Sequence, residues 1–395
     1  MTVGPHIYLD YNATTPLHPE VKRFVEGALV NFGNPSSVHW FGREAKKAMG
    51  QTRERLARFI NCDPLEIVFT SGGSEANNLA LKGYLFGLRS TRREIITSQV
   101  EHPSVLKTLD YFKRYGYVVH TVPVNRKGEF DLARYKSLLS SNTALVSIQY
   151  VNNETGNVFP IAEITKLAHD VGAVVHSDMV QALGKIPVDL KSTGVDLASF
   201  AGHKIYALKG SGALFVKRGI HLDSLIHGGG QERNRRAGTV NALAIGSLGA
   251  ALEFVPTELT EQSQRLSHLR DSLESRILNE IPRSSLNGGG AQRVANTLNI
   301  SFDGVDGETL LINLDTRGFA VSSGAACSSG SQEPSPILIA MGLSRVEASQ
   351  SLRISLGWLT TAAEIELFFQ ALKEAVAQMR AAFEDTESVV LESSL

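Results

Sequence analysis

Residues 196–212 read DLASFAGHKIYALKGSG, and the interpretation of the whole chain starts from this stretch. A short apolar strand is predicted at 197–200, and it runs directly into Gly202-His203-Lys204 and a glycine-broken turn. Lysine is normally exposed, because burying its ammonium group costs free energy. A lysine directly after a buried strand indicates either a depressed pKa or a bond to another group. The alternative is an ordinary surface lysine in a loop, and the rest of the sequence has to decide.

The composition is that of an ordinary globular protein, with 43% hydrophobic and 20% charged residues. A chain of 395 residues is too long for one compact core, so two domains are expected. A net charge of -1 gives no reason to expect nucleic acid or a membrane as a partner, and no apolar run reaches membrane-spanning length. The N-terminus lacks a secretory signal pattern, and the two cysteines form neither a disulfide framework nor a multi-cysteine metal site. We therefore expect a cytoplasmic protein without a bound metal.

The order of the predicted elements defines the fold class. Between residues 67 and 216, short apolar strands alternate with helices. This alternation indicates an α/β fold with a mostly parallel sheet covered on both faces. After residue 238 a long helical stretch runs to about Pro282, with a break expected at Pro256, and a smaller α+β domain follows. We expect a large domain over residues 16–257 and a small domain formed by residues 1–15 and 258–395.

Polar side chains follow several of the predicted strands, where a doubly wound sheet binds its ligands. The segment 70–75 (TSGGSE) opens a helix; it can bring backbone amides to a phosphate, or Ser74 can be a plain helix N-cap. The other strand ends carry Glu101, His102, Asn152, Asn153, Glu154, His176, Asp178, Gln181 and Lys204. Each alone can be a satisfied buried residue or a turn former. Together they supply what pyridoxal phosphate (PLP) requires: an acid, a hydrogen-bond donor, a flat ring and a lysine.

Nine short motifs are spread along almost the whole chain. They are 8–16 (YLDYNATTP), 32–37 (FGNPSS), 101–102 (EH), 152–156 (NNETG), 203–204 (HK), 228–232 (GGGQE), 236–239 (RAGT), 322–327 (SSGAAC) and 352–357 (LRISLG). With these motifs the chain resembles the PLP-dependent cysteine desulfurases of the nitrogen-fixation and iron-sulfur-assembly type, within the class V aminotransferases. The resemblance implies the fold-type-I architecture, with a large PLP-binding domain and a smaller α+β C-terminal domain.

The resemblance also implies catalytic and cofactor-binding roles. Lys204 would form the Schiff base with PLP and transfer protons. Asp178 would keep the pyridine nitrogen protonated, and Gln181 would donate a hydrogen bond to the phenolic oxygen. His102 would stack on the ring and shuttle protons. Cys327 would be the third catalytic residue.

Other residues would hold the phosphate or the substrate. The phosphate would be bound by Gly73, Ser74 and His203, and by Thr239 from the neighbouring subunit of a homodimer with shared active sites. Asn153 would contact both cofactor and substrate, Asn34 would contact substrate, and Arg353 would pair bidentately with the substrate α-carboxylate.

Cys327 determines which reaction is expected. Its surroundings, residues 322–336, are small and polar, which predicts an exposed loop, whereas Cys62 is expected to be buried and inert. The resemblance implies that Cys327 takes sulfur from L-cysteine as a persulfide, leaving L-alanine. The sulfur would pass to a protein acceptor such as an iron-sulfur scaffold or a component of a thiolation pathway.

Two positions depart from the family pattern and leave alternatives open. Ala201 stands where the family usually has a phosphate-binding serine, and Ala207-Leu208 stand where it usually has Gly-Pro. Loss of one charge-assisted hydrogen bond would weaken PLP binding by about 1.5–3 kcal/mol. One alternative is another PLP reaction, selenocysteine lysis or transamination, with Cys327 incidental. The other is a cofactor-poor scaffold relative without catalytic activity.

Overall fold

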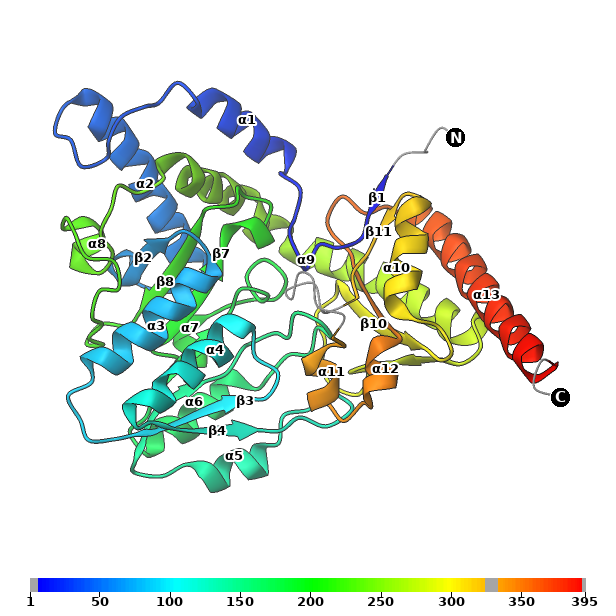
Figure 1. Ribbon diagram of the computed structural model, residues 1–395. Coiled ribbons are helices and arrows are strands. Elements are labelled where there is room, and N and C mark those ends of the chain that lie inside the picture. Colours follow the sequence, from blue (N-terminus) through cyan, green and yellow to red (C-terminus); the bar gives the residue numbers. More distant parts are fainter. Residues whose placement is uncertain (1–5, 324–332, 393–395) are drawn as a thin grey trace.

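A seven-stranded sheet forms the centre of the larger domain in the computed structural model, which describes residues 6–323 and 333–392 (Figure 1). In spatial order its strands are β2 (Ile67–Thr70), β8 (Gly212–Val216), β7 (Leu197–Ala201), β6 (Val174–Asp178), β5 (Thr143–Ser147), β3 (Glu94–Ser98) and β4 (Val118–Val122). Every pairing is parallel except the two made by β8. The predicted α/β class with a mostly parallel sheet is therefore confirmed.

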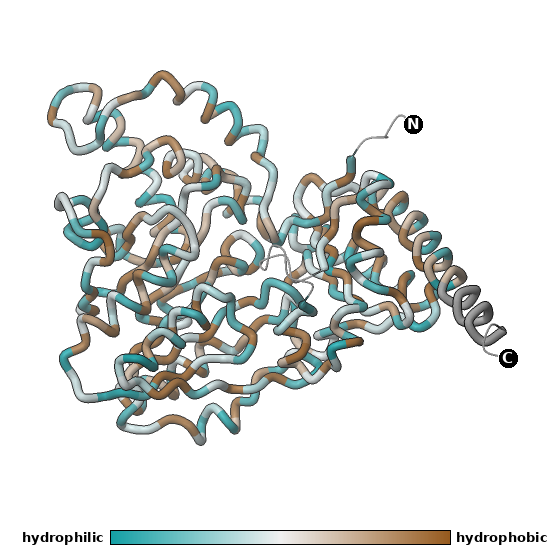
Figure 2. The backbone as a smooth tube through the Cα atoms, in the orientation of Figure 1, coloured by the Kyte–Doolittle hydropathy of each residue, from teal (hydrophilic) through white to brown (hydrophobic). Residues whose placement is uncertain are grey.

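Helices cover both faces of this sheet, as the alternating sequence requires. They are α1 (Pro19–Ala28), α2 (Trp40–Phe59), α3 (Gly73–Gly87), α4 (Pro103–Phe112), α5 (Leu132–Leu138), α6 (Ile161–Asp170), α7 (Leu190–Thr193) and α8 (Gln231–Asn234). Single 3₁₀ turns occur at Pro64–Glu66, Lys113–Tyr115 and Gly202–Lys204. In Figure 2 the tube is mostly brown, and so hydrophobic, along the inner strands and mixed along the outer helices.

The smaller domain combines the first residues of the chain with its C-terminal third. The elements of these two segments are β1 (Ile7–Tyr8), β9 (Ser284–Leu286), β10 (Thr297–Phe302), α10 (Gly307–Thr316), β11 (Phe319–Ala320), α11 (Pro336–Ala340), α12 (Arg345–Ser349), β12 (Ser351–Ser355) and α13 (Ala362–Glu392). Helices α11 and α12 contribute Ile337, Leu338 and Ala348 to the core of the large domain. Strand β1 pairs in parallel with β11, while β9, β10 and β12 form an antiparallel sheet. Leu9, Phe302 and Phe368 belong to a core separate from that of the large domain.

The two domains share one long helix, α9 (Ala242–Glu280). The break expected at Pro256 is wrong, because the helix passes through this residue. Pro256 is exposed, whereas Phe254, Val255 and Leu259 around it are buried, so packing on both sides of the proline outweighs the missing backbone donor. The predicted division at residue 257 falls inside this helix, and the domain limits stay a prediction.

Helix α9 is also long and apolar enough to cross a membrane, by length and composition alone. However, 67% of its most apolar window is buried inside the protein. Burial of this kind is typical of the core helix of a globular protein, which is hydrophobic on all sides.

Candidate active site

A cavity of about 650 Å³ lies beyond the carboxyl ends of β6 and β7, where an open α/β sheet binds its ligands. It is lined by Gly73, Ser74, His102, Asn153, Asp178, Gln181, His203, Lys204 and Arg353, all of which are predicted site residues. The strand ends, the start of α3 and strand β12 of the small domain thus contribute to one site.

Two predicted site residues among the described ones do not line this cavity. Asn34 and Thr239 are exposed and do not line it, and Asn34 Oδ1 accepts a hydrogen bond from Ser36 N (2.9 Å) in its own turn. Cys327 lies outside the described residues. Cys62 is partly buried, and burial with help from Glu66 raises the pKa of its thiol to about 12, so it is protonated at neutral pH.

Four of the predicted strand-end residues are buried and do not line the cavity: Glu101, Asn152, Glu154 and His176. His176 lies within β6, where its ring nitrogens are 2.9 Å from Ser147 Oγ and 3.0 Å from Ser199 Oγ. Glu101 accepts hydrogen bonds from Ser98 Oγ (2.5 Å) and Gln149 N (2.9 Å). The side chains of His176 and Glu101 are therefore directed at buried polar partners within the protein.

Lys204 ends the 3₁₀ turn that follows β7, and its amine reaches into the cavity. Its Nζ donates hydrogen bonds to the backbone oxygens of Asn12 and Ala13, both at 2.6 Å. The lysine is therefore an inward, hydrogen-bonded group, and the surface-lysine alternative does not describe it.

Asp178, at the end of β6, is held by two donors. Asn77 Nδ2 donates to its Oδ2 (2.7 Å), and Val180 N donates to its Oδ1 (3.0 Å). These contacts fix a buried carboxylate at one end of the cavity. Such a group can bind a protonated ring nitrogen.

His102 is the N-cap of α4 and presents its ring to the same cavity. Its Nδ1 accepts a hydrogen bond from Ser104 N (3.1 Å) and lies 2.7 Å from Ser104 Oγ. Burial lowers the pKa of His102, the charge of Asp178 opposes that effect, and Lys204 adds to it. The ring is therefore neutral at pH 7 and can both stack and transfer protons.

The start of α3 forms an anion-binding end of the cavity. Gly72 is the N-cap without a side-chain bond, so Ser74 lies inside the helix and is not its cap. A Cβ on Gly73 would lie 2.7 Å from Val180 Cγ2, so a larger residue at this position would require the Val180 side chain to move. Backbone amides at a helix N-terminus favour a phosphate group.

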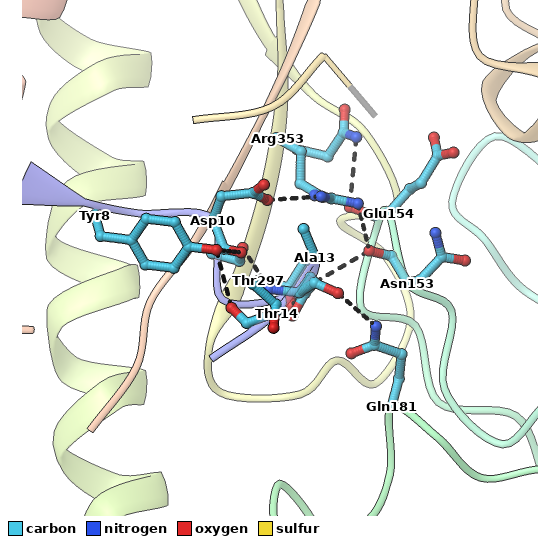
Figure 3. Close-up of polar contacts among 12 residues, drawn as sticks. Tyr8, Asp10, Ala13, Thr14, Asn153, Glu154, Gln181, Thr297 and Arg353 are labelled. Atoms are coloured by element: carbon cyan, nitrogen blue, oxygen red, sulfur yellow. Dashed lines mark hydrogen bonds and ion pairs between the residues drawn. The ribbon is translucent and has the colours of Figure 1, made fainter. Parts of the chain in front are cut away.

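Arg353 enters the cavity from β12 and lies between Asp10 and Asn153 (Figure 3). Its Nη2 is 2.7 Å from Asp10 Oδ1, and its Nη1 donates to the backbone oxygen of Asn153 (3.2 Å). Arg353 Nε and Asn153 Oδ1 are buried and have no hydrogen-bond partner among the described residues. Buried polar atoms in this condition are typical of a site that binds a polar ligand.

The site contains residues that the sequence reasoning did not assign. Asn12 contacts Lys204 through its backbone oxygen. It lies in the YLDYNATTP motif, which indicated that the segment belongs to the family pattern but did not assign a role to this residue. Asn77 supports Asp178 from inside α3, and no sequence pattern indicated it. Lys185 bonds Asn12 from behind the cavity, and its spacing of four residues from Gln181 was the available signal.

The chemistry of this donor set fits PLP. An amine is present for the aldehyde, a carboxylate for the pyridine nitrogen, a neutral imidazole for the ring face and a helix N-terminus for the phosphate. One departure from the family pattern also has a structural explanation. Leu208 N donates to Ser247 Oγ (3.0 Å), a hydrogen bond that proline at this position cannot make.

Comparison with known proteins identifies the family. The family described as "Aminotransferase class-V" matches residues 7–368. The chain is 45% identical over 376 residues to a cysteine desulfurase of Trichormus azollae, covering 95% of this chain and 94% of that protein. It is 42% identical to the cysteine desulfurase NifS of Azotobacter vinelandii, covering 95% and 93% of the two chains. A solved structure titled "NIFS-LIKE PROTEIN" superimposes with a TM-score of 0.88 at 34% identity, covering 94% of this chain and 99% of that one.

The chain therefore belongs to the class-V aminotransferases, a family of PLP-dependent enzymes with the fold-type-I architecture. Within that family it is a member of the cysteine desulfurases of the NifS and IscS type. The resemblance and the cofactor inferred from the sequence are confirmed.

Proposed function

We propose that this enzyme converts L-cysteine to L-alanine with the site described above, and that Cys327 receives the sulfur. The observation that carries this proposal is the convergence of Lys204, Asp178 and His102 on one cavity, with Arg353 entering it from the other domain. These groups can bind an amino acid and move its α-proton.

Each residue has a defined task. When PLP is bound, it accepts the electron pair released from the substrate Cα–H bond. Lys204 Nζ takes the α-proton, and Asp178 holds a proton on the ring nitrogen. Neutral His102 would cover the ring face and can relay a proton through its imidazole ring. Arg353 binds the α-carboxylate through the part of its guanidinium group that lines the cavity.

The sulfur step needs no external oxidant or reductant. The Cys327 thiolate attacks the substrate sulfur, and an S–S bond forms as the substrate Cβ–S bond breaks. The electron pair of the broken bond stays with the carbon skeleton, which takes up protons and leaves as alanine. The enzyme keeps the sulfur as a persulfide on Cys327, ready for a thiol or a metal-sulfur scaffold to accept. The assignment of this role to Cys327 rests on the SSGAAC motif.

The proposal includes a homodimer. The loop between α1 and α2 and the first turn of α2 expose a cluster of large apolar residues: Leu29, Val30, Phe32, Val38, Trp40 and Phe41. An exposed apolar cluster of this size favours a protein interface. A partner subunit there would also give a function to Asn34 and Thr239, which do not line the cavity of their own chain. An iron-sulfur scaffold in the cytoplasm is the proposed sulfur acceptor, in keeping with the NifS and IscS names of the relatives.

A single-turnover reaction tests the proposal. Holoenzyme is mixed with one equivalent of L-cysteine, alanine is quantified, and persulfide is trapped and located by mass spectrometry. We expect stoichiometric alanine and a persulfide on Cys327, and neither product from Cys327→Ala, which should still bind PLP. Cys62→Ala is the matched control and should react normally. Full alanine formation by Cys327→Ala would refute the proposed sulfur step.

A further inference from the structure

Lys185 is a second lysine close to the site, and the proposed chemistry does not use it. It follows Gln181 by one turn, and its Nζ donates to the Gln181 side-chain oxygen Oε1 and to Asn12 Oδ1, the latter at 2.7 Å. It also lines a small cavity behind the site together with Lys204. A lysine at this depth needs an explanation, because its ammonium loses most of its hydration.

The contacts of Lys185 fix the orientation of the Gln181 amide. A lysine side chain presents N–H donors, and a backbone carbonyl only accepts. The Oε1 end of Gln181 faces Lys185, and its Nε2 donates to the backbone oxygen of Asn12 (2.9 Å). If the amide were reversed, its N–H groups would face the donors of Lys185, and its oxygen would face the backbone oxygen of Asn12. Both ends of the side chain therefore select the same orientation.

This orientation places an N–H group beside the catalytic lysine. The backbone oxygen of Asn12 accepts from Gln181 Nε2 at 2.9 Å and from Lys204 Nζ at 2.6 Å. The donor end of Gln181 thus shares an acceptor with the amine to which PLP becomes attached. In PLP the carbon that carries the phenolic oxygen is next to the carbon that carries the aldehyde, so Gln181 would be the residue to hold this oxygen when the cofactor is bound to Lys204.

We propose that Lys185 is a positioning residue that fixes the donor direction of the Gln181 amide, so that Gln181 offers N–H, and not C=O, to the phenolic oxygen of PLP. This inference rests on the proposed role of Gln181 toward the cofactor. Asn12 is held in the same way: its Oδ1 accepts from Lys185 and from Asn296 Nδ2 (3.1 Å), and its Nδ2 donates to Thr297 Oγ1 (2.9 Å).

The proposal holds for either protonation state of Lys185. Burial lowers the pKa of this lysine well below its usual value, and the charges of Lys204 and Arg353 lower it further. A neutral amine still has two N–H groups, which match the two acceptors on Asn12 and Gln181. The lone pair of a neutral amine could accept from a reversed amide, but the backbone oxygen of Asn12, which only accepts, still opposes that reversal.

The test is a spectroscopic titration of the PLP-loaded enzyme. The apparent pKa of the cofactor absorbance depends on hydrogen bonding to the phenolic oxygen, because a donor there stabilises the anionic form. Gln181→Ala is expected to raise this pKa by about one pH unit, the size of one lost charge-assisted hydrogen bond. Lys185→Met should raise it in the same direction, and the double variant should show no further rise. Lys185→Arg, which also presents only donors, should restore most of the parental value.

A matched control is Lys217→Met, which removes contacts to Asp196 Oδ1 (3.0 Å) and Gly194 O (3.4 Å) on the far side of the sheet. It can lower stability but should leave the cofactor pKa unchanged. If Lys185→Met does not fold, Lys185→Gln takes its place, since this side chain can meet Gln181 with either end.

The outcomes distinguish a failure of the inference about Lys185 from a failure of the proposed role of Gln181. If Gln181→Ala shifts the cofactor pKa and Lys185→Met does not, the inference about Lys185 is overturned and the proposed function stands. A Lys185→Met shift that persists in the Gln181→Ala background also overturns it, since Lys185 would then act without Gln181. If Gln181→Ala itself produces no shift, the proposed role of Gln181 fails, and the inference fails with it.

Discussion

Replacing Ala201 by serine is expected to tighten PLP binding by about 10- to 100-fold. Ala201 ends β7, is 1% exposed and lines the cavity. Its Cβ lies 3.6 Å from the position that a Cβ on Gly73 would occupy, so a serine hydroxyl would lie at the anion-binding start of α3. One hydrogen bond to a charged group contributes about 1.5–3 kcal/mol, and about 1.4 kcal/mol corresponds to tenfold in affinity.

The assay is an equilibrium titration of the cofactor-free enzyme with PLP, followed by absorbance in phosphate-free buffer. The same titration with pyridoxal, which lacks the phosphate, should show no gain for Ala201→Ser. Ala198→Ser is the matched control, because Ala198 is fully buried on the opposite face of β7. It should lower stability by about 1–3 kcal/mol through an unsatisfied hydroxyl and leave PLP affinity unchanged. Equal affinity of Ala201→Ser and the parent for PLP, or an equal gain for pyridoxal, would refute the reasoning.

Three further changes test other parts of the structure. Leu208→Pro should cost about 1 kcal/mol in urea unfolding by losing the bond to Ser247 Oγ, and the cost should vanish in a Ser247→Ala background. Burial lowers the pKa of His176 to about 4, so between pH 6.5 and 4 the unfolded chain binds more protons than the folded protein. The free energy of unfolding should therefore fall as the pH falls through this window. If the free energy of unfolding of His176→Gln fell more steeply with falling pH than that of the parent, this reasoning would be wrong. Asp178→Asn should reduce alanine formation by at least about 100-fold while PLP still binds, and an unchanged rate would exclude the proposed role of this carboxylate.

The sequence predicted the parts of the molecule that depend on local patterns. The α/β class followed from alternating strands and helices, and the cavity followed from the rule that parallel strands end at one edge of a sheet. The side-chain directions of His176 and Glu101 could not be predicted, because each depends on hydroxyl and amide partners from neighbouring strands. The continuity of α9 through Pro256 was missed because it is decided by burial against other elements, which a local rule does not contain.

The roles of Asn12 and Lys185 were missed for a related reason. Asn12 has hydrogen-bond partners about 140 to 340 residues away in the chain, and no local pattern carries that information. Asn34 and Thr239 were named from the family motif alone, and in a single chain neither lines the cavity.

The hydrogen bonds of Asn12 also limit when the enzyme can acquire its cofactor during synthesis. Its backbone N–H donates to Ser355 Oγ (2.9 Å), and its side chain accepts from Asn296 Nδ2 (3.1 Å). Domains generally fold as units while the chain is translated from its N-terminus. Lys204 leaves the ribosome long before Ser355. At that time Asn12, which accepts a hydrogen bond from Lys204, still lacks its partners Asn296 and Ser355. We expect stable PLP capture only after nearly the whole chain has been released, and nascent chains that end before residue 355 should not retain the cofactor.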